Sequence, residues 1–173
     1  ENGYINGSGG KLNPTANITR EEFAQVLFNI INKYISEEGT YSEDITGNIV
    51  IRSPGVILKD MTVKGDIILA EGVAEGSVVL ENVKVTGRLL VRSGGSTEGI
   101  NIKGTSNISE ILIYDKSGVA VDVSEDAVVD KINVQSDNTV LNIAKTSLTI
   151  AAGIKGTIVN GEAVTGGKTI DID

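Results

Sequence analysis

A repeat of 22 residues dominates the centre of this chain. Residues 56–69 read VILKDMTVKGDIIL and residues 78–91 read VVLENVKVTGRLLV, with the same order of polar and apolar side chains. The apolar triplet at 67–69 recurs at 89–91 and again at 111–113. A fixed period of this length is typical of stacked-repeat proteins, in which each unit buries its apolar face only against its neighbours.

Each repeat contains three short alternating runs separated by Gly, Asn or Asp, which is the pattern of strands and turns. A unit of this length with three strands is one coil of a parallel β-helix. We therefore predict a mainly β fold, a right-handed parallel β-helix (a solenoid) of roughly five or six coils with one N-terminal α-helix, its coils about 4.8 Å apart. Val, Ile and Leu must fill the core, because only 3% of the residues are aromatic.

The repeat is less regular outside its centre. Ile111 is followed by Ile132 after 21 residues, and Ile132 by Ile154 after 22. The middle run of the repeat fades at Thr105 and Asn107, where apolar residues are expected. These offsets predict that the later coils stack on the same three columns of strands.

Charged residues flank the third run and predict which side chains face the core. Asp66, Arg88 and Glu110 must face water, so the first and third residues of each following triplet face inward. The inward set is Ile67, Leu69, Leu89, Val91, Ile111 and Ile113. The charged residues then form a ladder of alternating sign, and the middle residues of the triplets form an outward apolar row of Ile68, Leu90 and Leu112.

The outward row has two interpretations. Isolated apolar residues on a solvent-facing strand are common and need no function. A contiguous apolar stripe more often contacts something, and we favour a docking strip occupied by the N-terminal helix. The alternative, in which this helix covers the N-terminal end of the solenoid, stays open from sequence.

The composition excludes several classes of function. The net charge of −8 argues against nucleic-acid and membrane partners. The chain has no His and no Cys, so the commonest general base, zinc ligand and thiolate nucleophile are missing. We therefore expect no metal, no cofactor and no enzymatic activity.

Acidic residues are the remaining candidates for chemistry. A glycoside hydrolase needs two carboxylates about 5–9.5 Å apart across the sugar. Asp60 with Asp66, or Glu110 with Asp130, are the candidate pairs, and a polysaccharide lyase or hydrolase is an alternative function. The acidic stretch at 115–130 lacks the spacing of a calcium loop, and we interpret it as solubilising turn residues.

Aromatic side chains suited to sugar binding are few. The predicted solenoid contains only Tyr41 and Tyr114. Tyr114 is expected at an outward position beside Arg92, where a glycan contact is an alternative to covering a sheet edge. A carbohydrate-binding β-helix is therefore the second alternative function.

The two ends of the chain carry local signals. Thr19 and Glu22 have the spacing of a capping box, and Ile18 and Phe23 that of a hydrophobic staple, so we predict a helix over residues 20–34. At the other end, the dipeptide at 160–161, Asn-Gly between apolar runs, predicts a β-hairpin that closes the end of the rod.

The N-terminal segment resembles the C-terminal half of an S-layer homology repeat over about residues 3–34. The matching features are Gly3-Tyr4, Asn6-Gly7, Pro14 and the ITREEFA sequence at 18–24, in which Glu22 replaces the usual Ala. The resemblance implies non-covalent anchoring to secondary cell-wall polysaccharide, with Arg20 matching the arginine that contacts the anionic glycan. We expect Arg20 to be the vestige of a site that upstream residues complete. The remaining sequence resembles, more loosely, the pectate-lyase-like β-helices.

These observations together predict two domains, a partial S-layer homology repeat with a capping helix at 1–38 and a β-helix at 39–173. We expect a non-enzymatic, extracellular structural module in the cell wall or S-layer of a Gram-positive bacterium, acting as a spacer, display or assembly element. The expected partner is cell-wall polysaccharide, bound through a complete S-layer homology region rather than this fragment alone. Self-association is a further expectation.

Overall fold

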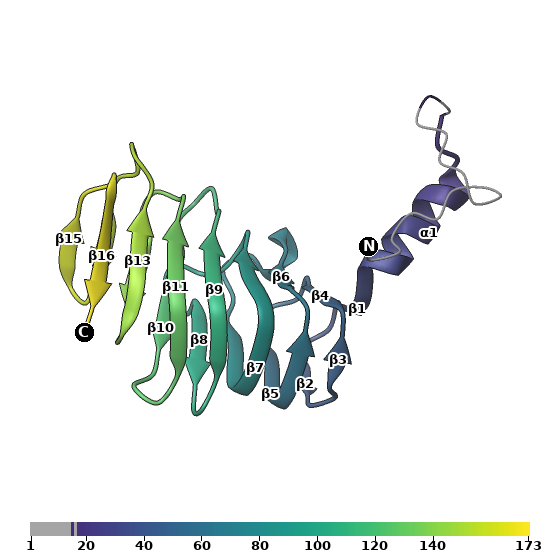
Figure 1. Ribbon diagram of the computed structural model, residues 1–173, viewed down its shortest axis with the longest axis horizontal. Helices are drawn as coiled ribbons and strands as arrows, with labels where there is room; N and C mark the ends of the chain where they lie inside the picture. The colour runs from purple at the N-terminus through teal and green to yellow at the C-terminus, as the bar shows by residue number, and fades with distance from the viewer. Residues whose placement is uncertain (1–14, 16) are drawn as a thin grey trace.

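The computed structural model describes residue 15 and residues 17–173. It is a β-solenoid of about six turns with a single α-helix near the N-terminus, as predicted (Figure 1). The residues Gly3-Tyr4, Asn6-Gly7 and Pro14, which carry part of the family resemblance, lie outside the described residues.

Short strands make up almost all of the ordered elements. The helical elements are α1 (Arg20–Ile30) and one turn of 3₁₀ helix, η1 (Glu71–Val73). The strands are β1 (Ile31–Ile35), β2 (Gly39–Tyr41), β3 (Ile45–Thr46), β4 (Asn48–Ile51), β5 (Val56–Lys64), β6 (Ile67–Leu69), β7 (Val78–Val91), β8 (Ile100–Lys103), β9 (Asn107–Ile113), β10 (Ala120–Val123), β11 (Val128–Val134), β12 (Val140–Asn142), β13 (Thr146–Ile150), β14 (Thr157–Val159), β15 (Glu162–Val164) and β16 (Lys168–Ile172).

Successive coils pair in parallel, and the central coils keep the predicted register. Leu69 pairs with Val91, and Val91 pairs with Ile113, so the observed step equals the period of the repeat. All six side chains predicted to face inward are fully buried. Asp60 and Asn82 turn the chain between the first two columns, with positive φ angles of 51° and 55°. The front strands of the solenoid therefore lie side by side in Figure 1.

The middle column of strands continues from β7 into β9, with a shift of one residue in the pairing. Val85 pairs with Ile108, because a register irregularity follows Val85. Ser106 and Ile108 are fully buried, so the prediction that placed Thr105 and Asn107 in this column is wrong. The Ser106 hydroxyl donates to the Lys103 carbonyl at 2.7 Å and accepts from the Val83 N–H at 3.0 Å. These bonds satisfy buried backbone groups where the register shifts.

The last coils are shorter than predicted. Ile132 pairs with Leu148, which comes earlier in the chain than the predicted partner, Ile154. The loop at 135–139 that leads into the last coil is shorter than the loop at 92–99, which separates two of the central coils. Ile154 lies in the loop after β13 and packs, half-buried, against the core.

The helix begins as predicted and ends four residues early. Thr19 Oγ1 accepts from the Glu22 N–H at 3.2 Å, and Glu22 accepts from the Thr19 N–H at 2.9 Å, which confirms the capping box. The helix ends at Ile30, where β1 begins, so the predicted end at residue 34 is wrong. In this segment β-sheet pairing outweighs the helical periodicity, because β1 pairs with β4 and buries Ile35. The predicted domain boundary at residue 38 stays a prediction.

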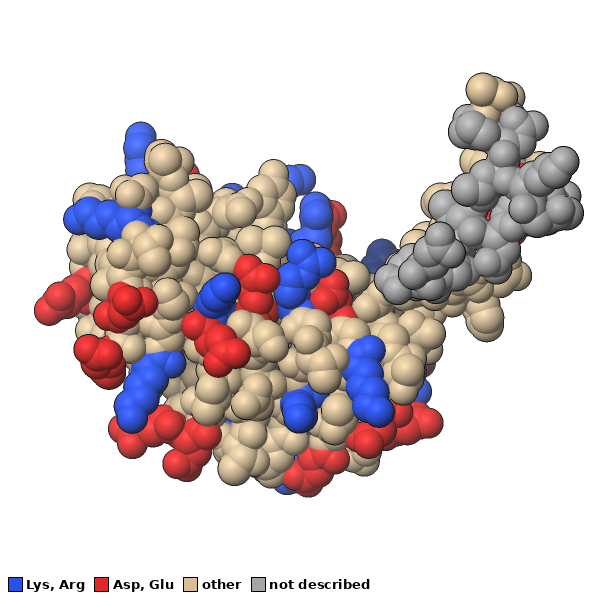
Figure 2. Space-filling model, viewed as in Figure 1, with Lys and Arg blue, Asp and Glu red and all other residues tan. Residues whose placement is uncertain are grey.

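Charged side chains form ladders between coils. Arg88 Nη2 lies 3.0 Å from Asp66 Oδ2, and Lys59 Nζ lies 2.8 Å from Glu81 Oε1. Glu110 pairs in register with Arg88, which continues the predicted alternation of sign. The hydrogen bonds to Asp66 and Glu81 raise the pKa of Arg88 and of Lys59 respectively. On the face drawn in Figure 2, positive and negative side chains are interspersed rather than gathered by sign.

Two antiparallel strands close the C-terminal end. β14 and β15 form the hairpin predicted from the Asn-Gly dipeptide at 160–161, and β16 pairs antiparallel with β13. Coils elsewhere in the solenoid add parallel strands, so an antiparallel strand at the end interrupts the stacking direction. The predicted hairpin is therefore confirmed, and β16 covers the neighbouring strand β13.

Removing this cap is expected to cause self-association. Deleting residues 160–173 leaves β13 and β14 with unpaired parallel edges, which pair readily with other chains. In sedimentation velocity, the apparent mass of the deletion variant should grow more steeply with concentration than that of the full chain. A deletion variant whose sedimentation does not change with concentration would contradict a protective role of β15 and β16.

Candidate binding surface on the third column

The predicted apolar row lies on the outer face of the third column of strands. Ile68 pairs with Leu90, and Leu90 with Leu112, so the three side chains stack on adjacent coils. Val50 extends the row by one coil and Tyr34 by another. Tyr34 is 51% exposed, whereas the aliphatic members are half-buried.

The N-terminal helix does not occupy this row. Figure 1 shows α1 projecting away from the N-terminal end of the solenoid. The helix has no buried residue, and Phe23 and Phe28 are 52% and 76% exposed. The expectation that α1 lies on Ile68, Leu90 and Leu112 is therefore wrong.

Replacing Leu90 with aspartate tests this correction. Because α1 lies away from the row, Leu90→Asp should leave the hydrogen exchange of the α1 amides unchanged. The variant should lower the stability of the solenoid only slightly. Faster exchange confined to residues 20–30 in the variant would instead indicate that the helix packs on the row in solution.

A column of arginine and tyrosine side chains runs beside the apolar row. The N–H groups of Arg52, Ala70, Arg92 and Tyr114 each donate to the coil before, at 2.8, 2.8, 3.0 and 2.8 Å, so these residues occupy successive coils. The Arg92 guanidinium lies 5.6 Å from the centre of the Tyr114 ring. This is a cation–π distance and confirms that the two residues are neighbours.

The two arginines border an open hollow of about 430 Å³. We name it the arginine hollow; it is lined by Arg52, Ala70, Glu71, Gly72 and Arg92. The small side chain of Ala70 lies between the arginines and leaves the space open. Among the described residues, neither arginine is in an ion pair.

Arg52 is held from two sides. Its Nη1 donates to the Tyr34 hydroxyl at 3.5 Å, and this bond raises the pKa of Arg52. Its stem lies against Gly72, where an added Cβ would be 2.2 Å from Arg52 Cγ. The tyrosine and the glycine backbone thus restrict the position of the Arg52 side chain.

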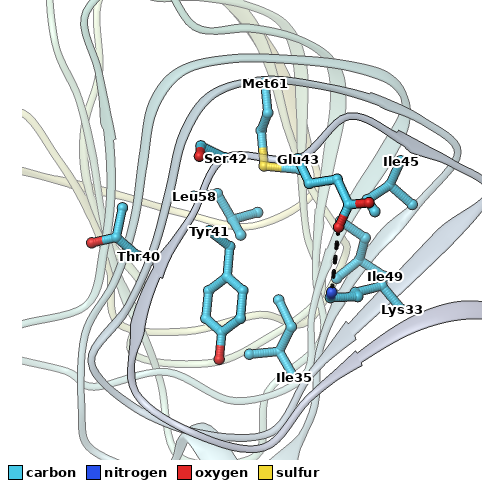
Figure 3. A pocket seen from close by; sticks show the side chains of 10 residues that line it. All are labelled: Lys33, Ile35, Thr40, Tyr41, Ser42, Glu43, Ile45, Ile49, Leu58 and Met61. Carbon is cyan, nitrogen blue, oxygen red and sulfur yellow. Dashed lines mark ion pairs between the residues drawn. The ribbon is translucent and has the colours of Figure 1, made fainter.

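A second cavity lies at the N-terminal end of the solenoid core (Figure 3). It has a volume of about 220 Å³ and is lined by Lys33, Ile35, Thr40, Tyr41, Ser42, Glu43, Ile45, Ile49, Leu58 and Met61. Lys33 Nζ lies 3.7 Å from Glu43 Oε2 at its edge. No residue of α1 lines it, so the helix does not fill the end of the core. The cavity is an open end of the apolar interior, bordered by polar side chains.

The carboxylates considered for catalysis are engaged in ladders. Asp60 accepts from Asn82 Nδ2 at 2.7 Å, and Asp66 pairs with Arg88. Glu110 accepts from the Asn133 side chain. These contacts hold the side chains along the stack of coils rather than across a sugar-sized gap.

Arg20 and the carboxylates of the acidic stretch at 115–130 do not line the arginine hollow. Arg20 is the first residue of α1 and is exposed; within the described part of the chain no ion pair involves it. Asp122 faces outward between buried Val121 and Val123, as predicted.

Over residue 15 and residues 17–173, no group of three or more acidic side chains is placed to hold a metal ion. In the same range no helix is long and apolar enough to cross a membrane.

Sequence reasoning missed Tyr34 and Arg52 as members of this surface. The helical periodicity places Tyr34 at the end of the helix, and Arg52 lies outside the regular repeat. The sequence signal for Arg52 is a step between coils that is shorter than the repeat. Arg52 precedes Ala70 by the same interval that separates Ile51 from its strand partner Leu69, so Arg52 and Ala70 occupy equivalent positions on adjacent coils.

Comparisons with protein-family models, with curated protein sequences and with solved structures found no match to this chain.

Proposed function

We propose that this chain is a non-enzymatic structural module of a bacterial cell-surface protein, in which the solenoid is a stiff spacer, display or assembly element. The observation that carries the proposal is the continuous stack of parallel coils on one aliphatic core. A solenoid of this kind buries each coil between two others and leaves a uniform rod exposed. The resemblance of residues 18–24 to an S-layer homology repeat supports a location in the cell wall or S-layer, next to an anchoring region that binds wall polysaccharide.

Hydrogen bonds at the corners of the coils support a mechanical role. Asn32 Oδ1 accepts from the Asn48 N–H at 2.9 Å, and Asn48 Oδ1 accepts from the Asp66 N–H at 2.9 Å. Asp66 Oδ1 accepts from the Arg88 N–H at 2.7 Å. One side chain per coil thus ties its corner to the next coil, in addition to the backbone pairing. Such ties resist sliding between coils, which suits a spacer.

An enzymatic role is the weaker alternative. The candidate pairs Asp60 with Asp66 and Glu110 with Asp130 would have to flank a sugar, and three of these four residues are committed to ladder contacts. A polysaccharide lyase or hydrolase would release unsaturated products or reducing ends from wall or plant polysaccharides. Such products, lost in Asp66→Asn or Glu110→Gln, would replace the structural proposal.

Localisation and force measurements test the proposal together. Immunogold labelling of the source cells with antibodies to the solenoid should decorate the outer wall, and extraction that removes the surface layer should remove the label. Pulling the chain between its ends should require high force, because backbone pairing and corner hydrogen bonds tie each coil to its neighbours. Intracellular label, or coils that detach one by one at low force, would overturn the proposal.

A further inference from the structure

We propose that the arginine hollow binds an acidic saccharide through its carboxylates. This site is separate from the structural role and does not depend on it. The inference rests on three features: two guanidiniums without an ion-pair partner among the described residues, their positions on coils two apart, and the tyrosines that bracket them.

The guanidiniums of Arg52 and Arg92 are available for a ligand, whereas the guanidinium of Arg88 is already paired with a carboxylate. Arg88, on the same coil as Arg92, is bonded to Asp66 at 3.0 Å. Arg52 and Arg92 instead contact Tyr34 and Tyr114, and within the described part of the chain neither guanidinium is within ion-pair distance of a carboxylate. A guanidinium without a carboxylate partner matches a planar oxyanion through two parallel hydrogen bonds.

Spacing and shape allow a chain-like ligand to contact both arginines. The backbones of Arg52 and Arg92 are two coils apart, which corresponds to about 10 Å along the solenoid axis. A saccharide lying along the column would present a separate carboxylate to each guanidinium. Tyr34 and Tyr114 lie at the two ends, 51% and 53% exposed, and offer ring faces and hydroxyls to the sugars.

Glu71 favours a saccharide over a densely charged polyanion as the ligand of the hollow. Its carboxylate lines the hollow and lies 3.9 Å from Lys116 Nζ, so its charge is only loosely compensated. It repels densely charged chains and accepts hydrogen bonds from hydroxyl groups. With the overall charge of −8, this disfavours nucleic acid and favours a polymer that alternates hydroxyls with isolated carboxylates.

Titration with oligogalacturonate, followed by amide resonances of the full chain, tests the inference. The expected result is binding, with shifts centred on Gly72 and Arg92. Fully methyl-esterified oligogalacturonate, which keeps the sugars and removes the charge, should bind at least about 10-fold more weakly, since hydrogen bonds to charged groups contribute that much or more. Polyglutamate of equal length, which keeps carboxylates and removes the sugars, should also bind more weakly.

Variants assign the binding to the hollow. Arg52→Gln and Arg92→Gln should each weaken binding about 10-fold. Arg88→Gln is the matched control, because it removes the same charge from the same coil outside the hollow, and should leave binding unchanged. Absence of binding, equal binding of polyglutamate, or an equal loss in Arg88→Gln would each overturn the proposal. Unchanged thermal melting of the glutamine variants ensures that a lost signal is not lost folding.

Discussion

Replacing Leu89 with alanine is expected to lower the free energy of unfolding by about 3 kcal/mol, because the deletion leaves a cavity in a fully buried site. Leu89 lies in β7, in the centre of the stack, where coils above and below fix the surrounding side chains. The site therefore has little freedom to collapse around the smaller residue. Chemical unfolding followed by far-UV circular dichroism measures the change.

The adjacent residue provides the matched control. Leu90 is the same residue type on the same strand, but it faces outward and is half-buried. Leu90→Ala should cost about 1 kcal/mol or less. Equal losses for the two variants would contradict the assignment of inward and outward faces, on which the apolar row and the arginine column both depend.

Replacing Gly65 with alanine is expected to destabilise the chain by about 3 kcal/mol, because the new methyl group meets backbone that cannot move aside. A Cβ on Gly65 would lie 2.3 Å from the Gly47 carbonyl oxygen, and a Cβ on Gly87 would lie 2.5 Å from that of Gly65. The three glycines stack at one corner of successive coils. An alanine there pushes neighbouring coils apart and disturbs the corner hydrogen bonds of Asn48 and Asp66.

Gly153→Ala separates this steric effect from the effect of glycine's backbone freedom. Gly153 has a φ of 87° and no atom within 4 Å of an added Cβ, so its substitution should cost only about 1–2 kcal/mol of backbone strain. Gly65 has no such φ, so its larger loss would come from contact alone. A smaller loss at Gly65 than at Gly153, measured by thermal melting, would contradict the close approach of coils at this corner.

The fold could be predicted because its main signal is periodic. The steps between Leu69, Val91 and Ile113, with charged residues flanking the triplets, identify the core face and the register without tertiary information. The hairpin at 160–161 and the capping box at Thr19 are short-range signals that depend on few neighbours, and both predictions are confirmed.

The misplaced elements are those where long-range pairing outweighs local pattern. Residues 31–34 continue the helical periodicity, but β4 offers them a strand partner, which the sequence of the segment alone does not reveal. The one-residue shift at Ser106 and the short step from Ile132 to Leu148 arise from loops whose lengths differ between coils. The arginine hollow was missed for the same reason, since Arg52 reaches its place only through a coil that is shorter than the repeat.

Disulfide formation between introduced cysteines tests the stacking of coils most directly, because the chain contains no cysteine of its own. Ile68 and Leu90 are strand partners on adjacent coils, with a spacing of about 4.8 Å that a disulfide can bridge. Ile68 and Leu112 are two coils apart, about 10 Å, which is too far. Under mild oxidation at low protein concentration, the Ile68→Cys/Leu90→Cys variant should lose both thiols, and the Ile68→Cys/Leu112→Cys variant should keep them. Retained thiols in the first variant, or equal loss in both, would contradict the solenoid.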